Sequence, residues 1–233
     1  MFFVPQWWQY PTMRQGIGSE GPLGPIHHVG GLLPRDFWFS DSRLVLNPPF
    51  TGETTANGFT FRGRLSYNSG SLLKTGFGVV ARYVLSPDRI PRPERGPWRS
   101  VPRLDLFGLI SGGTTAPDIF AGDKWSKCSL IKRQTIFQHV FSPPGTDNRR
   151  IIGHNVESEQ LIFIEGAGKD QHKQLLPGFK PMPPVVIDQI FPGIPIWAEL
   201  EVRFDIQVVG DSTLWIDNDI VVRLDQWPLE PIG

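Results

Sequence analysis

The sequence has almost no cysteine, no excess of either charge and no long apolar run. Its 233 residues include one cysteine, Cys128, so no intramolecular disulfide can form and the fold does not depend on an oxidising compartment. Lys plus Arg and Asp plus Glu number 23 each, which excludes global charge as the basis for binding nucleic acid or a membrane surface. Because no apolar run reaches about 18 residues, the sequence predicts no membrane-spanning helix.

Glycine, proline and aromatic residues are abundant instead. The chain contains 25 Gly and 23 Pro, together with 16 Phe and 8 Trp. Gly and Pro destabilise the interior of a helix by about 1 and 3 kcal/mol relative to Ala, so this composition leaves little room for long helices. An apolar content of 39% is enough to supply a core. The composition favours strands joined by many turns.

One stretch alternates between apolar and polar residues for much longer than an ordinary strand. From Ile196 to Val208 every even position is apolar, whereas the odd positions carry charged or amide side chains. A period of two is typical of a strand with one buried face. At about 3.4 Å per residue the stretch would span roughly 44 Å, which requires a large facing layer. We therefore expect an all-β protein, an antiparallel, jelly-roll-like β-sandwich with long loops.

The rest of the chain predicts eight to ten strands in a single domain. Residues 1–35 combine Pro and Gly with almost no charge, and we expect an extended N-terminal arm there, followed by one β-sandwich domain over 36–233. We expect turns at 68–70 and 210–212, and an interruption at 217–219. A long Pro-rich loop is expected over 87–102.

The predicted arm carries a large aromatic load for a segment without periodicity. Disordered tails are typically poor in aromatic residues, so we expect the arm to be held against its own domain or against a neighbouring subunit. These aromatic side chains are the first candidate contact residues: Phe2, Phe3, Trp7, Trp8 and Tyr10.

Charge is distributed unevenly, with a basic middle and an acidic end. The polar row of the long alternating stretch includes Glu199, Glu201 and Asp205, and we expect these acids to face a neighbouring subunit. Arg and Trp are enriched in protein contacts, and Arg with an aromatic can also hold a polyanion. The candidate residues for contact with a partner or a polyanion are Arg89, Arg92, Arg95, Trp98, Arg99 and Arg103.

No intact catalytic or metal-binding motif is present. Glu199 and Glu201 would lie about 7 Å apart on one face, within the range of glycosidase carboxylates, but the intervening Arg203 favours ion pairing. His139, His154 and His172 lack the close spacing of metal ligands, although a site assembled from distant strands remains an alternative. We expect no catalytic residue, no cofactor and no resident metal.

These observations favour the hypothesis of a structural protein that assembles with copies of itself or with other subunits and is similar in architecture to viral coat proteins. The first residues lack a basic segment followed by a continuous apolar one, so we expect no signal peptide. Cytoplasmic synthesis and, for a viral protein, a place in the virion are expected. One alternative is a carbohydrate-binding module using Trp98, Trp125, Trp197 or Trp215. Another is a metal-dependent, cupin-like enzyme.

Overall fold

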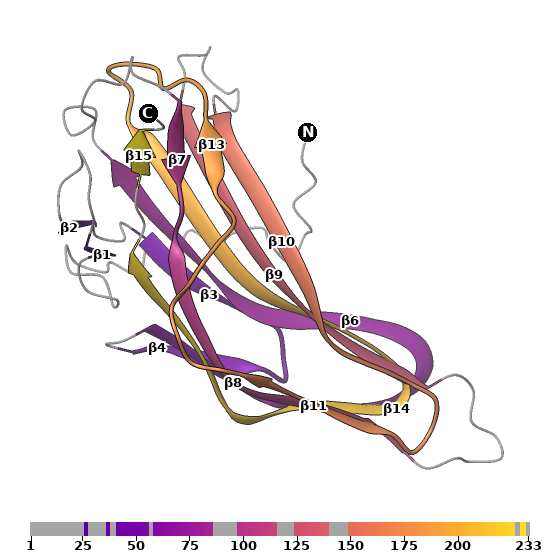
Figure 1. Ribbon diagram of the computed structural model, residues 1–233. Helices are drawn as coiled ribbons and strands as arrows, with labels where there is room; N and C mark the ends of the chain where they lie inside the picture. The colour runs from indigo at the N-terminus through magenta and orange to yellow at the C-terminus, as the bar shows by residue number, and fades with distance from the viewer. Residues whose placement is uncertain are drawn as a thin grey trace.

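The computed structural model describes residues 26–27, 36–37, 41–55, 58–85, 97–115, 124–139, 149–226 and 229–231. All regular elements in these ranges are β-strands (Figure 1), and they contain no helix that is long and apolar enough to cross a membrane. The strands are β1 Ile26–His27, β2 Asp36–Phe37, β3 Asp41–Leu46, β4 Thr51–Thr55, β5 Gly58–Arg62, β6 Arg64–Leu85, β7 Trp98–Ser100, β8 Arg103–Thr114, β9 Trp125–His139, β10 Arg149–Glu165, β11 Asp170–Leu175, β12 Lys180–Pro181, β13 Val185–Ile187, β14 Ile196–Gln226 and β15 Leu229–Pro231.

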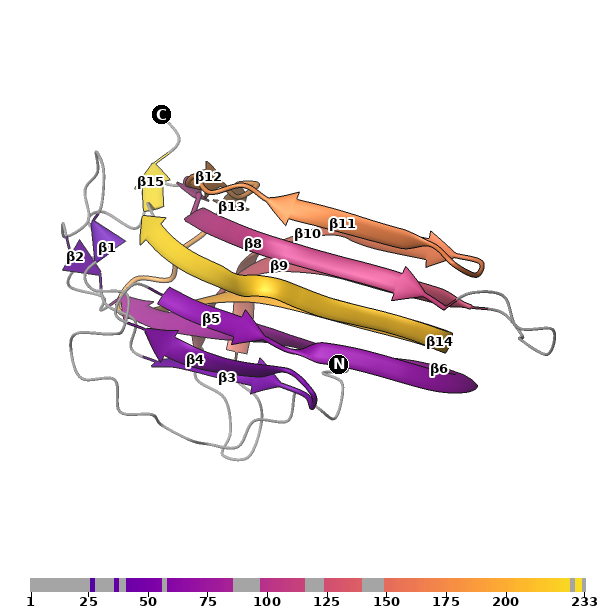
Figure 2. The same ribbon diagram turned by 90° about the horizontal axis from the view of Figure 1, so that it is seen from below.

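Two long strands, β6 and β14, are shared by both layers of an antiparallel sandwich. The first half of β14 lies between β9 and the second half of β6, and β10 and β3 flank these strands. We call this the first layer. The second half of β14 lies between β8 and the pair formed by β5 and the start of β6, with β11, β12 and β4 outside them. Figure 2 shows this second layer, with β11, β8, β14 and β6 side by side.

A short sheet extends the second layer at one end. β7 pairs with both β13 and β15. The strands next to them in the chain pair in the same way, because β8 pairs with β12 and β14. Gln134 of the first layer donates a hydrogen bond to Ser100 of β7 at 2.5 Å, which ties this sheet to the opposite layer. The short sheet therefore completes one side of the same sandwich.

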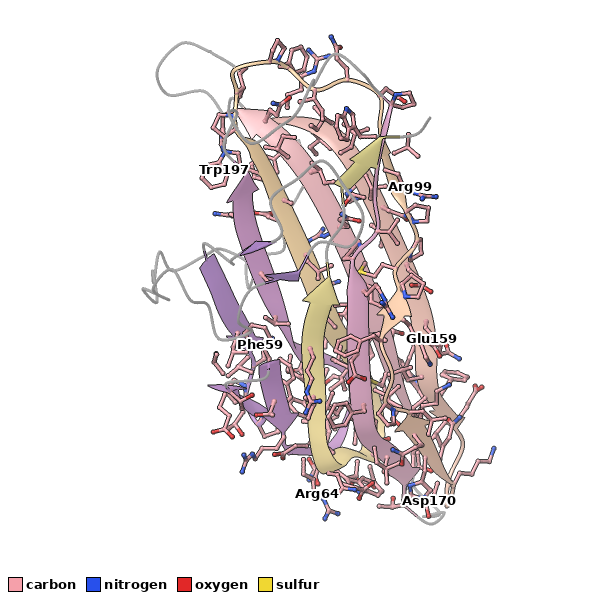
Figure 3. The ribbon with its side chains drawn as sticks, turned by 60° about the vertical axis from the view of Figure 1, so that its left-hand side comes forward. Phe59, Arg64, Arg99, Glu159, Asp170 and Trp197 are labelled. Carbon is pink, nitrogen blue, oxygen red and sulfur yellow. The ribbon has the colours of Figure 1, made fainter. Side chains whose placement is uncertain are left out.

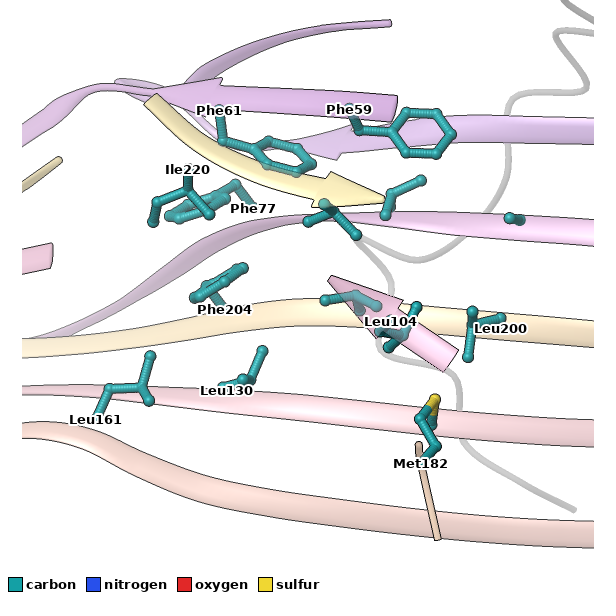
Figure 4. Packing of buried hydrophobic residues seen from close by; sticks show 14 of the residues in the cluster. Phe59, Phe61, Phe77, Leu104, Leu130, Leu161, Met182, Leu200, Phe204 and Ile220 are labelled. Atoms are coloured by element: carbon teal, nitrogen blue, oxygen red, sulfur yellow. The ribbon is translucent and has the colours of Figure 1, made fainter. Parts of the chain in front are cut away.

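The core lies between the two layers and is rich in phenylalanine. Phe77 of β6 stacks on Phe204 of β14 with ring centroids 4.7 Å apart, and Phe61 of the second layer lies 5.2 Å from Phe77. All three rings are fully buried (Figure 4). Even-numbered residues of β14 from Ile196 to Val208 are buried along this interface, as the alternating pattern predicts. The prediction of an all-β, antiparallel, jelly-roll-like sandwich is confirmed.

The expected breaks within the long strands are wrong. β6 runs through 68–70, and β14 runs through both 210–212 and 217–219. β-bulges absorb the turn-like residues, because an extra residue can leave the ladder without ending the strand. Gly210 has φ of 70°, a left-handed conformation that glycine adopts without a Cβ clash. The register shifts lie between Val208 and Gly210, between Ile216 and Asn218, and between Asn218 and Val221.

The domain boundaries and the long loops remain predictions for the most part. Residues 1–25 and 28–35 of the expected arm lie outside the described residues, as do 86–96 of the expected Pro-rich loop. Within the arm, β1 pairs antiparallel with β2, which begins just beyond the expected boundary at residue 35. At the end of the Pro-rich segment, residues 98–100 form β7 and not a loop.

Candidate functional site

The outer face of the first layer, which points away from the core, carries a row of charges on β14. Glu201 forms ion pairs with two arginines, Arg133 of β9 and Arg203 of β14 itself. Arg203 also pairs with Asp205, with its Nε atom 2.7 Å from Oδ1. Arg203 and Asp205 are half-buried, and Glu201 is buried. The row is therefore paired within the chain.

Burial influences the ionisation of two acids in this row. Loss of hydration raises the pKa of Glu201, and the neighbouring Arg133 and Arg203 oppose that rise. Burial also raises the pKa of Asp205, again opposed by Arg203. Both carboxylates need their arginine partners, because an unpaired buried charge is costly.

Glu199 completes the row by pairing with Arg82 of β6. The Nε atom of Arg82 donates a hydrogen bond to Glu199 Oε1 at 2.8 Å, and the Arg82 guanidinium lies 6.0 Å from the centre of the Trp197 ring. The ion pairing expected from Arg203 is thus present across three strands. Glu199 and Glu201 already accept guanidinium groups, an arrangement suited to holding strands together and not to general acid–base chemistry. Their contact with a neighbouring subunit stays a prediction.

The first layer ends at β10, which is an edge strand of 17 residues. Among the described strands β10 pairs only with β9, so one side of its backbone forms no ladder. We call this side the β10 edge. Ile151, Val156 and Phe163 point to the outer face of β10, and their exposed fractions are 45%, 49% and 45%. A long edge with an apolar row is a typical site of strand pairing between chains.

The sequence did not reveal this edge. Ile151 and Val156 are separated by five positions and Phe163 lies seven further on, so no period of two connects them. The structure explains the spacing, because two β-bulges interrupt the pairing of β10 with β9. Each bulge shifts the alternation by one residue and returns an apolar side chain to the outer face.

A cleft of about 270 Å³ opens between the layers beside β11 and β12. Apolar residues from both layers line it, among them Leu104, Leu130 and Met182. Three of its four charged side chains form ion pairs, because Lys173 lies 3.2 Å from Glu159 and Lys132 contacts Glu157. Figure 3 shows Glu159 on this side of the molecule. No nucleophile with an adjacent base lines the cleft.

A polar cluster lies on the outer face of the second layer. Ser111 of β8 donates a hydrogen bond to Asp217 of β14, and His172 Nδ1 lies 2.7 Å from the Ser111 hydroxyl. The indole N–H of Trp215 also donates to Asp217, and the Arg64 guanidinium lies over the Trp215 ring at 5.5 Å from its centre. Serine stands between histidine and aspartate here, so the order differs from a nucleophilic triad, in which histidine lies between the other two.

The arginine-rich segment is only partly described. Arg89, Arg92 and Arg95 lie outside the described residues. Arg99 is exposed on β7 (Figure 3), and Arg103 is half-buried at the start of β8.

Trp98 differs from the expectation of an exposed contact residue. It is fully buried, because β7 lies between two strands and turns residues 98 and 100 inward. The two flanking prolines hid this three-residue alternation in the sequence. Trp98 therefore contributes to the core and is not available to a polyanion or a sugar.

Among the described residues, the other candidate tryptophans and the candidate histidines do not converge on one site. Trp197 stacks near Phe137 with ring centroids 6.2 Å apart, and neither it nor Trp125 or Trp215 lines the cleft. His154 forms a hydrogen bond with Thr135 of β9, whereas His139 packs against Trp197. Thr135 and His139 are four residues apart on β9, a distance of about 14 Å along the strand. His172 lies in the second layer. Within the described ranges no group of three metal-ligating side chains is present.

Comparisons with known proteins do not add a family. No family model matches the chain, and no curated protein matches it. Among solved structures, TmCBM61 in complex with β-1,4-galactotriose is 11% identical, with a TM-score of 0.22, covering 79% of this chain and 88% of that one. A family 11 carbohydrate-binding module from Clostridium thermocellum is 12% identical, with a TM-score of 0.16, covering 72% and 87%.

A viral structure is similar to the same low degree. The infectious bursal disease virus Gx strain structure is 10% identical, with a TM-score of 0.16, and the match covers 88% of this chain and 47% of that one. Because all three TM-scores are far below 0.5, the ligands and assemblies of these proteins do not bear on this chain. The fold assignment rests on the chain's own strand pairing.

Proposed function

We propose that this chain is a structural subunit that assembles with copies of itself in the manner of a coat protein. The observation that carries the proposal is the β10 edge, a 17-residue unpaired strand side with an outward apolar row at Ile151, Val156 and Phe163. Soluble monomers usually blunt such an edge with charge, proline, β-bulges or a covering element, and β10 has two bulges but neither proline nor an outward Asp, Glu, Lys or Arg between Ile151 and Phe163. Pairing with another chain would bury the row and satisfy the backbone groups together.

The charge row of β14 supports the same function in a different way. Its ion pairs connect β6, β9 and β14 across the first layer, which stiffens the sheet to which β10 belongs. A rigid sheet loses little conformational entropy when it docks, so more of the contact energy appears as affinity. The predicted aromatic arm would supply a second contact between subunits.

Two valines of equal exposure provide the test. Val156 on β10 and Val186 on β13 are each 49% exposed, so lysine at either position has the same intrinsic effect on the surface. We expect Val156→Lys to weaken self-association by at least about tenfold, because the new charge would have to be desolvated in the contact. Val186→Lys should leave it unchanged. The measurement is the mass in solution by sedimentation over a range of concentrations.

Two outcomes would overturn the proposal. A full-length chain that stays monomeric at high concentration would end it, and equal effects of the two lysine variants would remove the β10 edge from it. Removing residues 1–34 tests the arm separately in the same assay. We expect a smaller assembly after truncation if the arm contacts a neighbouring subunit.

Carbohydrate binding is the second candidate, favoured by the surroundings of Trp215. Asp217, His172 and Ser111 offer hydrogen-bonding groups beside a half-exposed indole, which is a common composition for sugar sites. Arg64 already covers a face of the ring, so a sugar would have to displace it. Titration with a glycan panel would change the fluorescence of the wild type but not of Trp215→Phe; silence across the panel would exclude this candidate.

A further inference from the structure

The hydrogen bonds at the end of β10 show which of its backbone groups point outward. The N–H of Phe163 donates to the side chain of Gln171 at 2.9 Å, and the carbonyl of Glu165 accepts from Lys169 Nζ at 2.6 Å. The N–H of Gly166, by contrast, donates to Lys124 next to β9. Phe163 and Glu165 therefore direct their backbone groups to the β10 edge.

The register with β9 extends this assignment along the strand. Phe163 and Glu165 are opposite Lys127 and Trp125, which are odd-numbered residues of β9. Backbone groups alternate in direction along an unbulged strand, so every β10 residue opposite an odd-numbered β9 residue points its N–H and C=O outward. These residues are Arg149, Ile151, His154, Val156, Ser158, Gln160, Phe163 and Glu165, and the side chains from Ile151 onward also share the outer face.

This set is symmetric about Glu157. Each member has a counterpart at the same distance on the other side of residue 157: 149 with 165, 151 with 163, 154 with 160, and 156 with 158. The two β-bulges, at Ile151/Gly153 and at Gln160/Ile162, fix the centre at Glu157, because each shifts the alternation by one residue on its own side of that centre. An unbulged strand would match a reversed copy of itself about any of its residues, whereas the full set on β10 matches only about Glu157.

We propose that two copies of the chain pair antiparallel through their β10 edges, about a two-fold axis at Glu157. This rests on the proposed function and names its partner and register. Ile151 of each copy would lie opposite Phe163 of the other, and Arg149 opposite Glu165. The same patch contacts itself, as a closed two-fold interface requires. Every outward N–H and C=O of the set meets an equivalent group, and the first layers of the two copies join into one sheet.

The charge pattern of β10 agrees with this direction of pairing. Basic residues occupy its beginning and acidic residues its end, so an antiparallel copy places unlike charges together and a parallel copy would place like charges together. Three local costs accompany the contact. Gln171 must release the N–H of Phe163, and Lys169 must release the carbonyl of Glu165. Glu157 also comes to face its own copy, although each Glu157 is paired with Lys132.

A cysteine at the axis tests the register. Glu157 lies opposite the even-numbered Lys132, so its N–H and C=O point toward β9 and away from the β10 edge. The two Glu157 residues that meet at the axis would therefore be a non-hydrogen-bonded pair. Such pairs have Cα atoms about 4.5 Å apart, which a disulfide can bridge. We expect Glu157→Cys to form a covalent dimer under mild oxidation. Cys128 does not interfere, since it is buried and burial raises the pKa of its thiol.

Glu159→Cys is the matched control. In the proposed register residue 159 lies opposite residue 155, so the two introduced thiols are about 14 Å apart along the strands and should not join. Cross-linking of Glu159→Cys at the rate of Glu157→Cys would overturn the register. Failure of Glu157→Cys to cross-link in a chain that still assembles would overturn the β10 pairing and leave the proposed function standing. A chain that neither cross-links nor assembles would contradict both.

A charge exchange tests the direction of pairing independently of oxidation. Arg149→Glu places like charges opposite Glu165 twice in the interface, and we expect about tenfold weaker association by sedimentation. Adding Glu165→Arg should restore it. Restoration supports antiparallel pairing, and a double variant as weak as the single one would contradict it.

Discussion

The first half of the central strand β14 and the edge strand β10 belong to the same layer, but their outer faces carry opposite kinds of side chains. β14 carries charges that are buried and paired with neighbouring strands, whereas β10 exposes apolar side chains and an unpaired backbone. A central strand has neighbours on both sides that can neutralise its polar residues. An edge strand has a neighbour on one side only, so a second strand partner can come only from another chain.

This difference separates scaffold from contact surface. The acids Glu199, Glu201 and Asp205 are paired with arginines of the same chain, and their contact with a neighbouring subunit stays a prediction. On the β10 edge, Gln171 and Lys169 bond one N–H and one carbonyl near the end of the strand, and no described strand pairs with the rest. We therefore propose the edge as the principal contact between copies and assign the charge row to the stability of the sheet.

The largest expected effect comes from removing the arginine at the centre of the charge row. Arg203→Ala takes a partner from both Glu201 and Asp205, and we expect the free energy of unfolding to fall by about 3 kcal/mol, because breaking a buried ion pair leaves an uncompensated charge. Chemical denaturation measures this.

Arg62→Ala provides the control for that experiment. Its ion pairs with Glu53 and Asp219 are exposed on both sides, so their loss should cost no more than about 1 kcal/mol. Equal losses in the two variants would mean that the row on β14 is an ordinary solvated surface. The contrast between central and edge strands would then disappear.

An intermediate effect is expected from Gln171, which caps the β10 edge. Gln171→Ala frees the N–H of Phe163 for a second chain and removes the cost of releasing it. A hydrogen bond of this kind is worth about 1 kcal/mol and the two-fold contact contains two of them, so self-association should strengthen by about thirtyfold. Sedimentation equilibrium measures the change. Weaker association after this substitution would show that Gln171 belongs to the contact and that the edge is not free to pair.

The smallest effect is a pH dependence of stability. Burial raises the pKa of Glu201 in the folded chain, so the folded state holds more protons than the unfolded state above the ordinary carboxyl range of about 4 to 4.5. The stabilisation that Glu201 gives the folded state is complete below that range. It is lost as the pH rises through the pKa of Glu201 in the folded chain. Its slope is at most about 1.4 kcal/mol per pH unit. Glu201→Gln should flatten the slope in denaturation series, and a steeper slope would contradict this assignment.

The sequence predicted the fold class well and the edge poorly. The alternation from Ile196 to Val208 is local information, and the core formed as that pattern indicates. The lengths of β6 and β14 could not be predicted, because turn-like residues such as Gly210 were absorbed by bulges that only the neighbouring strands reveal. Edge position is a property of the whole topology. The residues near Val156 do not indicate that one side of the strand has no strand partner.

Hydrogen exchange of the full-length chain at two concentrations tests the central claim most directly. In dilute solution the outward amides of β10, such as those of Ile151, Val156 and Ser158, should exchange rapidly, whereas the amides of β14 from Ile196 to Val208 should be protected. At concentrations where the mass increases, the account predicts new protection on β10 and no change on β14. An increase in mass with no added protection on β10 would contradict it.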